Sequence, residues 1–262
     1  MNYAVCIKQV PETSDVEIDP VRGTLKREGV DSKMNPFDLH ALEAAVEWRA
    51  RTGGTVTVVS MGPPQAAAVI KEAFSLGADH GILLSDRRFA GADTLATGYT
   101  LSRALLRLKP DIVICGMQTI DGDTAQVGPA IAEFLGLPQA AYVRRILSVQ
   151  EGALSVETDM GYALYRLELP LPCLLTVTRD VNRPRLPSYR QRLATRDRAV
   201  TIWSADDLGA GTDFGALGLD GSPTQVERIF SPEPNRAHEV WTGSGRDLAN
   251  RMYHTLKELK QL

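Results

Sequence analysis

The sequence predicts an α/β protein in three layers, with a doubly wound, mostly parallel sheet between two layers of helices, an antiparallel extension and an extended C-terminal arm. Three observations indicate this fold. Short apolar runs rich in Val and Ile are typical of strands that are buried on both faces. Apolar residues at three- and four-residue spacing between these runs indicate helices. Strands that alternate with helices through right-handed crossovers form a parallel sheet.

The first half of the chain supplies the parallel strands. The segment Pro11–Lys33 after the first strand is longer than most connections and rich in Asp, Gly and Thr, so we expect an excursion or a small hairpin there. A sheet of this kind binds its ligand outside the carboxyl ends of the strands, where the strand order reverses. The predicted strands are Tyr3–Val10, Thr55–Ser60, Gly81–Ser85 and Asp111–Cys115, and the helical spacing lies at Leu39, Leu42 and Val46, at Ala66, Val69, Ile70, Ala73 and Phe74, and at Leu101, Ala104, Leu105 and Leu108.

The pattern changes after Pro138. Turn signals separate four more apolar runs and predict an antiparallel meander joined to the sheet. No strand pattern follows Asp180, so we expect the rest of the chain to pack on a partner subunit. The expected regions are an α/β domain over residues 1–180, a basic loop over 181–207, and an arm with a final amphipathic helix over 208–262. The meander strands are Tyr142–Val149, Ala153–Thr158, Ala163–Leu169 and Cys173–Thr178, and the final helix carries Leu248, Met252, Leu256 and Leu259.

Composition narrows the class of protein. The chain has 262 residues, 23% of them charged, and a formal net charge of −3, which are ordinary globular values and argue against a disordered or nucleic-acid-binding chain. Cys6, Cys115 and Cys173 stand far apart and form no metal-binding motif, so we expect reduced, buried thiols. The N-terminus begins as a strand without a signal peptide, and no apolar run reaches about 20 residues. We therefore expect a cytoplasmic protein without a membrane span.

The segment Gly116–Pro129 leaves the fourth strand and enters a helix. Gly122 allows a tight turn, Thr124 is a candidate cap, and the free N–H groups of Thr124–Val127 would face an anion such as phosphate. Gln126 could add a side-chain donor. Asp121 and Asp123 oppose an anion unless they hold ribose hydroxyls or cap N–H groups. An ordinary strand–loop–helix turn would explain the same residues, and the segment alone does not separate the two interpretations.

Three other segments should meet this loop at the same edge of the sheet, namely Cys6–Val10, Met34–Asp38 and Ser60–Pro63. Cys6 and Met61 could enclose a base, while Asn35 and the Gly122 loop hold ribose and phosphate. Asn35 before Pro36 is also an ordinary start for a helix. The sequence contains neither G-x-G-x-x-G nor a Walker motif, so the site is not one of the common phosphate-binding loops.

These segments, in this order, resemble the β subunit of electron-transfer flavoproteins over nearly the whole chain. The resemblance is carried by Lys8-Gln9-Val10-Pro11, Met34-Asn35-Pro36-Phe37, Ser60-Met61-Gly62-Pro63, the loop Gly116–Pro129 and Asn182-Arg183-Pro184-Arg185. It implies an α/β/α nucleotide-binding domain, a heterodimer with an α subunit that carries FAD, and a C-terminal part that reaches over this partner. In the family, simple carriers hold AMP in the β subunit, whereas electron-bifurcating members hold a second FAD at the same place.

The loop sequence favours the bifurcating group. Simple carriers usually read Ile-Asp-Asp-Asp-x-Asn-Gln-Thr, whereas this chain has Gly122 and Ala125 in place of an Asp and the Asn. Both differences remove bulk beside the phosphate and make room for the diphosphate of FAD. The resemblance implies nucleotide contacts at Cys6, Asn35, Pro36, Met61, Gly116, Thr119, Asp121, Gly122, Asp123, Thr124, Ala125, Gln126 and Val127.

An Arg-rich stretch follows Asp180 and corresponds to the loop with which the family docks redox partners. Tyr189 lies at about the place of the apolar anchor, Leu186 or Leu193 could substitute for it, and Arg185 belongs to the basic setting. Such a stretch could also bind nucleic acid, which we do not favour, or be a solvated face. No grouping of His, Ser, Cys or acidic residues indicates a catalytic acid, base or metal site.

The resemblance thus implies electron transfer, in which the flavin performs the chemistry and redox activity requires the α subunit. In the bifurcating version, NADH or a similar donor reduces the FAD of this subunit, and the electrons divide between the FAD of the α subunit and a low-potential acceptor such as ferredoxin. One alternative is a simple carrier between a dehydrogenase and the quinone pathway, with structural AMP in this subunit. Another is a stand-alone adenine-nucleotide sensor that homodimerises, against which the long arm argues.

Overall fold

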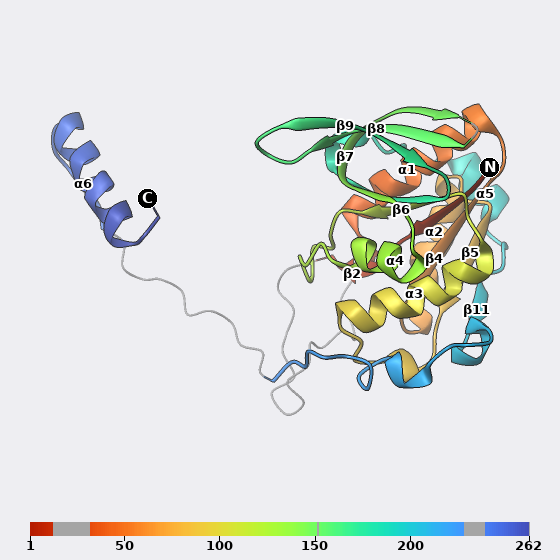
Figure 1. Cartoon of the computed structure of the whole chain (residues 1–262). Helices are drawn as coiled ribbons and strands as arrows, with labels where there is room; N and C mark the ends of the chain where they lie inside the picture. Colours follow the sequence, from red (N-terminus) through yellow and green to blue (C-terminus); the bar gives the residue numbers. More distant parts are fainter. Residues whose placement is uncertain (13–31, 151, 228–238, 262) are drawn as a thin grey trace. The chain divides into compact units, whose positions relative to one another are not determined.

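The computed structural model describes residues 1–12, 32–150, 152–227 and 239–261, and its contacts divide the chain into the units Met1–Glu227 and Arg228–Leu262. The first unit is an α/β structure around one large sheet (Figure 1). The order of the described strands is β11-β5-β4-β1-β6-β10-β7-β8-β9. Their bounds are β1 Asn2–Cys6, β4 Thr55–Met61, β5 His80–Leu84, β6 Ile112–Gly116, β7 Gln139–Gln150, β8 Ala153–Asp159, β9 Leu164–Pro170, β10 Cys173–Val177 and β11 Thr201–Trp203.

Helices cover both faces of the sheet, which confirms the predicted three-layer α/β fold. Helices α1 and α2 pack on one face, and α3 and α4 pack on the other. The strands are buried from both sides, so Val5 of β1 faces α1 and α2 whereas its neighbour Cys6 faces α3 and α4. The helices are α1 Pro36–Thr52, α2 Ala67–Leu76, α3 Thr94–Leu108, α4 Val127–Leu135, α5 Tyr189–Thr195 and α6 Gly245–Glu258, and the short 3₁₀ helices are η1 Pro64–Ala66, η2 Arg87–Phe89, η3 Arg179–Val181, η4 Ala205–Leu208 and η5 Phe214–Ala216.

Local sequence sets the ends of these helices. Pro36 is the first residue of α1, where its missing N–H costs nothing. Asp93 caps α3 by accepting hydrogen bonds from the N–H groups of Leu95 and Ala96. Helices α2 and α4 end at Gly77 and Gly136, which have the left-handed conformation that glycine adopts at little cost.

The first predicted strand is divided in two. Strand β1 ends at Cys6, and the chain then forms β2 (Gln9–Pro11), which pairs antiparallel with β3 (Ser32–Met34) in a separate two-stranded sheet. The pairing confirms a hairpin-like excursion at the borders of Pro11–Lys33. The interior of that segment, residues 13–31, lies outside the described residues.

The prediction of a four-stranded antiparallel meander was wrong in one strand. Strands β7, β8 and β9 are antiparallel, as expected, but β10 inserts between β6 and β7 and runs parallel to both. Buried Leu174 and Leu175 contact the two opposite helix layers. A strand with an apolar side chain on each face suits the middle of a sheet.

The expectation that no strand follows Asp180 was also wrong. Strand β11 extends the parallel sheet beside β5. After it, η4 and η5 bring Leu208 and Leu217 into the core beneath α3, where their exposed fractions are 1% and 2%. The first unit therefore includes residues 208–227, which the sequence had led us to expect in the arm.

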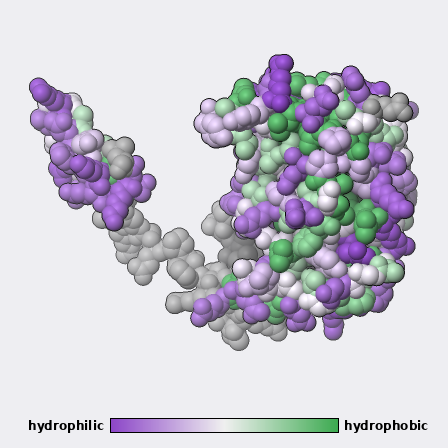
Figure 2. All heavy atoms as spheres, viewed as in Figure 1, coloured by the Kyte–Doolittle hydropathy of each residue, from purple (hydrophilic) through white to green (hydrophobic). Residues whose placement is uncertain are grey.

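The second unit contains α6, which is capped by Ser244 through the N–H of Asp247. No residue of α6 is buried within the described part of the chain, and its visible face is mostly hydrophilic (Figure 2). Two apolar side chains are exposed, namely Met252 in α6 and Leu259 directly after it. That this helix packs on a partner subunit remains a prediction. Among the helices that the structure describes, none has the length and apolar character needed to cross a membrane.

Candidate functional site

A cavity of about 990 Å³ opens at the carboxyl ends of β1, β4, β5 and β6. This is the switch point of the sheet, because β1 leads to α1 on one face whereas β6 leads to α4 on the other. The volume lies at the upper end of the range for small-molecule sites. The prediction of a ligand site at this edge from the strand order therefore agrees with the position of the cavity.

Most of the residues predicted to contact a nucleotide lie together around this cavity. Its walls come from the end of β1, the end of β4, the loop Ser85–Thr94 before α3, and the loop that joins β6 to α4. The predicted residues in the wall are Cys6, Met61, Gly116, Thr119, Gly122, Thr124, Ala125, Gln126 and Val127. Asn35, Pro36, Asp121 and Asp123 do not line it.

Asn35 lies behind the wall and holds the β6–α4 loop. Its side chain is fully buried and donates through Nδ2 to the carbonyl of Gln118, 2.9 Å away. Its Oδ1 accepts the N–H of Ile120 at 3.2 Å. The amide thus fixes the loop backbone at two points, and the structure assigns it a supporting position rather than one in the cavity wall.

The two Asp residues of the loop are bound within the protein, which resolves their conflict with an anion. Asp121 accepts the Lys8 ammonium at both carboxylate oxygens, at 2.8 and 2.7 Å. Burial raises the pKa of Asp121, but the hydrogen bond and charge of Lys8, together with a hydrogen bond from Thr119, outweigh this effect and hold the pKa below its usual value. Asp123 accepts the side-chain amide of Gln118 at 2.9 Å. The charge of Asp121 is thus compensated by Lys8, and Asp123 lies outside the cavity wall.

The loop differs from the prediction in how it enters α4. The helix begins at Val127 after Gln126, and no side chain of the described residues caps it. Thr124 was expected to be the cap and instead lies in the cavity wall, because the helix starts later than the sequence suggested. The left-handed residues are Asp123 (φ 49°) and Ala125 (φ 54°), whereas Gly122 was expected to make the turn.

This arrangement fits a nucleotide. The N–H groups in the first turn of α4 have no side-chain cap, and Gln126 and Val127 in the wall bring this positive helix end to the cavity. Met61, Phe89 and Leu101 supply apolar surface for a flat ring. Arg87 adds positive charge, whereas the charge of Lys8 is paired with Asp121. Groups of His, Cys, Asp and Glu that could hold a metal ion are absent from the described residues.

Several residues of the wall were not predicted from the sequence. The loop before α3 contributes Arg87, Phe89 and Asp93, and the first residue of α3 contributes Thr94. The side chain of Thr94 donates to Gln126 Oε1 at 2.9 Å and so joins the two sides of the cavity. An Asp directly before a helical pattern is a cap signal, and this signal after the third strand would have identified Asp93.

Asp38 was also not predicted as a site residue, and it lies at the base of the cavity. Its carboxyl accepts the backbone N–H of Lys8 at 2.7 Å and the side-chain amide of Asn35 at 2.9 Å. Burial raises the pKa of Asp38 to about 7, although the hydrogen bonds from Asn35, Lys8 and Gly116 act in the opposite direction. The group therefore titrates near neutral pH.

We predict a pH dependence of stability that originates at Asp38. The unfolded carboxyl titrates near pH 4 and the folded one at about 7, so between these values only the folded state keeps the proton. The free energy of unfolding should fall as the pH rises from about 4 to 7, by at most about 1.4 kcal/mol per pH unit. Urea denaturation of the full chain at several pH values measures it. Asp38→Asn should remove this component, and an unchanged profile would contradict the assignment.

The predicted docking residues differ in their surroundings. Leu186 and Tyr189 are 89% and 82% exposed, and Leu193 is 58% exposed. Arg185 is instead bound within the chain, since its guanidinium contacts both oxygens of the buried Glu43 carboxylate at 2.8 Å. This pair fastens the start of the exposed segment to α1. Docking by Tyr189, Leu186 or Arg185 remains a prediction.

The fold and the cavity define an α/β protein with a candidate ligand site at the switch point of a parallel sheet. Residues 22–208 match the family model described as "Electron transfer flavoprotein domain". The chain is 47% identical over 257 residues to "Electron transfer flavoprotein subunit beta" of Thermoanaerobacterium thermosaccharolyticum, with 98% of each chain covered. It is 45% identical over 239 residues to "Protein FixA" of Azorhizobium caulinodans, covering 88% of this chain and 85% of the relative.

A further relative is "Caffeyl-CoA reductase-Etf complex subunit CarD" of Acetobacterium woodii, 43% identical over 261 residues with 98% of each chain covered. The chain belongs to the electron transfer flavoprotein family, and within it to the beta subunits. Its role is electron transfer, and as a beta subunit it has an alpha subunit as its partner.

Proposed function

We propose that this chain binds FAD in the cavity and, together with the alpha subunit, takes part in flavin-based electron bifurcation from NADH or a similar donor. When bound, FAD supplies the redox chemistry. The protein holds the diphosphate with the open N–H groups at the start of α4 and with Arg87. Met61 and Phe89 present apolar surface to a ring system and exclude water from it.

The observation that carries the choice of FAD over AMP is the conformation of Ala125. This residue lines the cavity with φ 54°, in the left-handed region that costs an ordinary L-residue about 1–2 kcal/mol. Asn adopts this region more readily, and the simple carriers have Asn at the matching position. A small side chain is thus kept here at a conformational cost, which supports a requirement for space beside the ligand.

The name of the CarD relative supports the class of redox partner. That protein is named as a subunit of a complex between an Etf and a caffeyl-CoA reductase. We propose that the present chain likewise transfers electrons with a dehydrogenase or reductase, and that a low-potential carrier such as ferredoxin receives the other electron in bifurcation. The exposed Leu186 and Tyr189 are our candidates for the docking anchor.

The first test is the nucleotide content of the native heterodimer. The complex is purified, denatured and analysed by chromatography, and we expect two FAD and no AMP per heterodimer. One FAD with one AMP would identify a simple carrier, and the absence of both nucleotides from the beta subunit would refute the proposed site. Bifurcation itself requires that NADH oxidation yield reduced ferredoxin only in the presence of a second, high-potential acceptor.

Two substitutions test whether the small side chains of this loop leave the space that FAD requires. Ala125→Asn introduces the carrier-type residue in a backbone conformation that Asn accepts, so we expect unchanged or higher thermal stability with less FAD retained. Gly122→Asp should act in the same way, because the nearest atom to a Cβ at this position is Thr119 Oγ1 at an ordinary 3.5 Å. Retention of FAD by both variants would contradict the proposal.

A further inference from the structure

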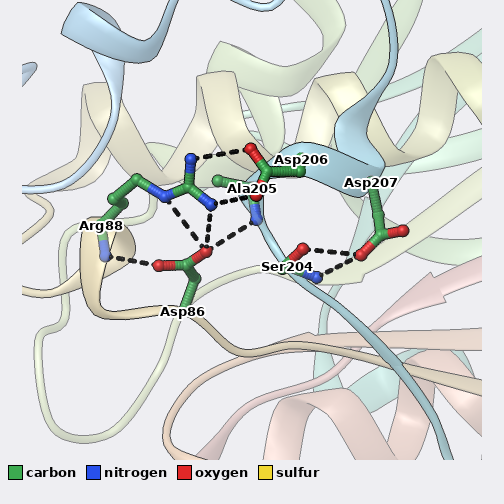
Figure 3. A network of polar contacts seen from close by, with 6 residues as sticks. All are labelled: Asp86, Arg88, Ser204, Ala205, Asp206 and Asp207. Atoms are coloured by element: carbon green, nitrogen blue, oxygen red, sulfur yellow. Dashed lines mark hydrogen bonds and ion pairs between the residues drawn. The ribbon is translucent and has the colours of Figure 1, made fainter.

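The loop before α3 forms one wall of the cavity, and residues far along the chain hold it in place. At its start, Arg88 bridges the carboxylates of Asp86 and Asp206 with N–O distances of 2.7 and 2.8 Å (Figure 3). The hydrogen bonds from Arg88 lower the pKa of Asp86. The N–H of Ala205 also donates to Asp86, so the segment at η4 is bound to the beginning of the wall.

The segment Gly218–Thr224 runs along the rest of this wall. Leu219 donates its N–H to the carbonyl of Ala90 at 3.0 Å. Its side chain lies so close to Gly91 that a Cβ there would stand 3.1 Å from it. The backbone of Gly218 also lies against the wall, because a Cβ at this position would be 2.2 Å from the carbonyl oxygen of Arg88. The backbone of the wall and that of the segment are therefore in direct contact.

The contact between the wall and the segment ends at Asp93. This residue lines the cavity and also forms hydrogen bonds with the segment Gly218–Thr224. Asp93 lines the cavity and caps α3 with Oδ1. Its Oδ2 accepts the Thr224 hydroxyl at 2.7 Å and the Thr224 N–H at 3.1 Å. Its own N–H donates to the hydroxyl of Ser222 at 2.8 Å, and Ser222 is 7% exposed.

We infer that Ser222 and Thr224 are positioning residues for the nucleotide site, acting through Asp93 on the start of α3. Thr94 follows Asp93 directly and donates to Gln126 across the cavity, so a shift at Asp93 reaches both walls. This inference rests on the proposed function of the cavity as an FAD site. It assigns a role in that site to residues that do not line it.

The test compares hydroxyl and methyl groups at the same position. Thr224→Val keeps the shape of the side chain and removes the 2.7 Å hydrogen bond to Asp93, whereas Thr224→Ser restores the hydroxyl. The control is Thr212→Val in the same part of the chain, because the Thr212 hydroxyl bonds to Gly209 and Arg103 and not to the wall. The heterodimer is dialysed, the released FAD is quantified by fluorescence, and hydrogen exchange is followed over residues 93–97.

We expect Thr224→Val to weaken FAD retention about fivefold and to speed exchange at residues 93–97, with wild-type behaviour in Thr224→Ser and Thr212→Val. Wild-type retention and exchange in Thr224→Val would overturn the inference, as would equal effects of Thr212→Val. If the wild-type cavity holds no FAD, the proposed function fails. Exchange at residues 93–97 then still decides whether Thr224 positions the wall.

Discussion

Replacing Gly116 with alanine is expected to destabilise the chain by about 2–3 kcal/mol and to abolish the proposed binding of FAD in the cavity. A Cβ at Gly116 would lie 2.4 Å from Asp38 Oδ1 and 2.8 Å from Phe37 Cβ. The backbone carbon of Phe37 is at 2.9 Å, so the start of α1 must move and no side-chain rotation relieves the clash. The move would separate Asp38 from the N–H of Gly116 at the base of the site.

Urea denaturation and the FAD content of the heterodimer measure the two effects. Gly122→Ala is the matched control for stability, because it adds the same methyl group in the same loop with its nearest neighbour at 3.5 Å. It should unfold at nearly the wild-type urea concentration. Equal stability of Gly116→Ala and the wild type would show that the contact between β6 and α1 is looser than described.

The second large effect is expected at Asn35. Asn35→Ala removes the donor to Gln118 and Asp38 and the acceptor of Ile120, and it leaves the buried Asp38 carboxyl and two partly buried backbone groups without this partner. Each unsatisfied group costs about 1–3 kcal/mol, so we expect a loss of about 2–4 kcal/mol together with loss of FAD. Thermal unfolding and nucleotide content are the measurements.

Asn182→Ala is the control for this variant. The Asn182 side chain also makes two hydrogen bonds, both to His40, but it does not touch the loop that joins β6 to α4. We expect this variant to lose stability and to keep its FAD. If Asn35→Ala retained FAD as well as Asn182→Ala does, the β6–α4 loop would not depend on Asn35 for its position.

The parallel half of the sheet could be predicted because its strands are marked locally. Runs such as Ile112–Cys115 are apolar at every position, and the helices between them have clear spacing. No local sequence signal indicates that β10 runs parallel to its neighbours. Its partners β6 and β7 are selected by burial on both faces, which depends on the packing of the whole molecule. Strand β11 was missed because three residues are too few to form a pattern.

The site was predictable where one segment contains both the turn and the ligand groups, as in the loop from Gly116 to Val127. It was not predictable where the interaction joins distant residues. Lys8 and Asp121 are 113 positions apart, and Asp93 and Thr224 are 131 apart. Sequence spacing says nothing about such pairs. Asn35 was predicted to contact the ligand, and the structure shows its amide bonded to the loop. A contact with ribose remains a prediction.

The position of β10 has a consequence for the order in which the chain can fold. Strand β6 has β1 on one side, and its other neighbour is formed only by residues 173–177. During synthesis, β6 therefore presents an open edge until the intervening strands β7, β8 and β9 have emerged and β10 can insert. Open strand edges in nascent chains promote misassociation, and pairing between distant segments is slow. The central strand beside the cavity is thus completed late, and its edge stays open to misassociation during this interval.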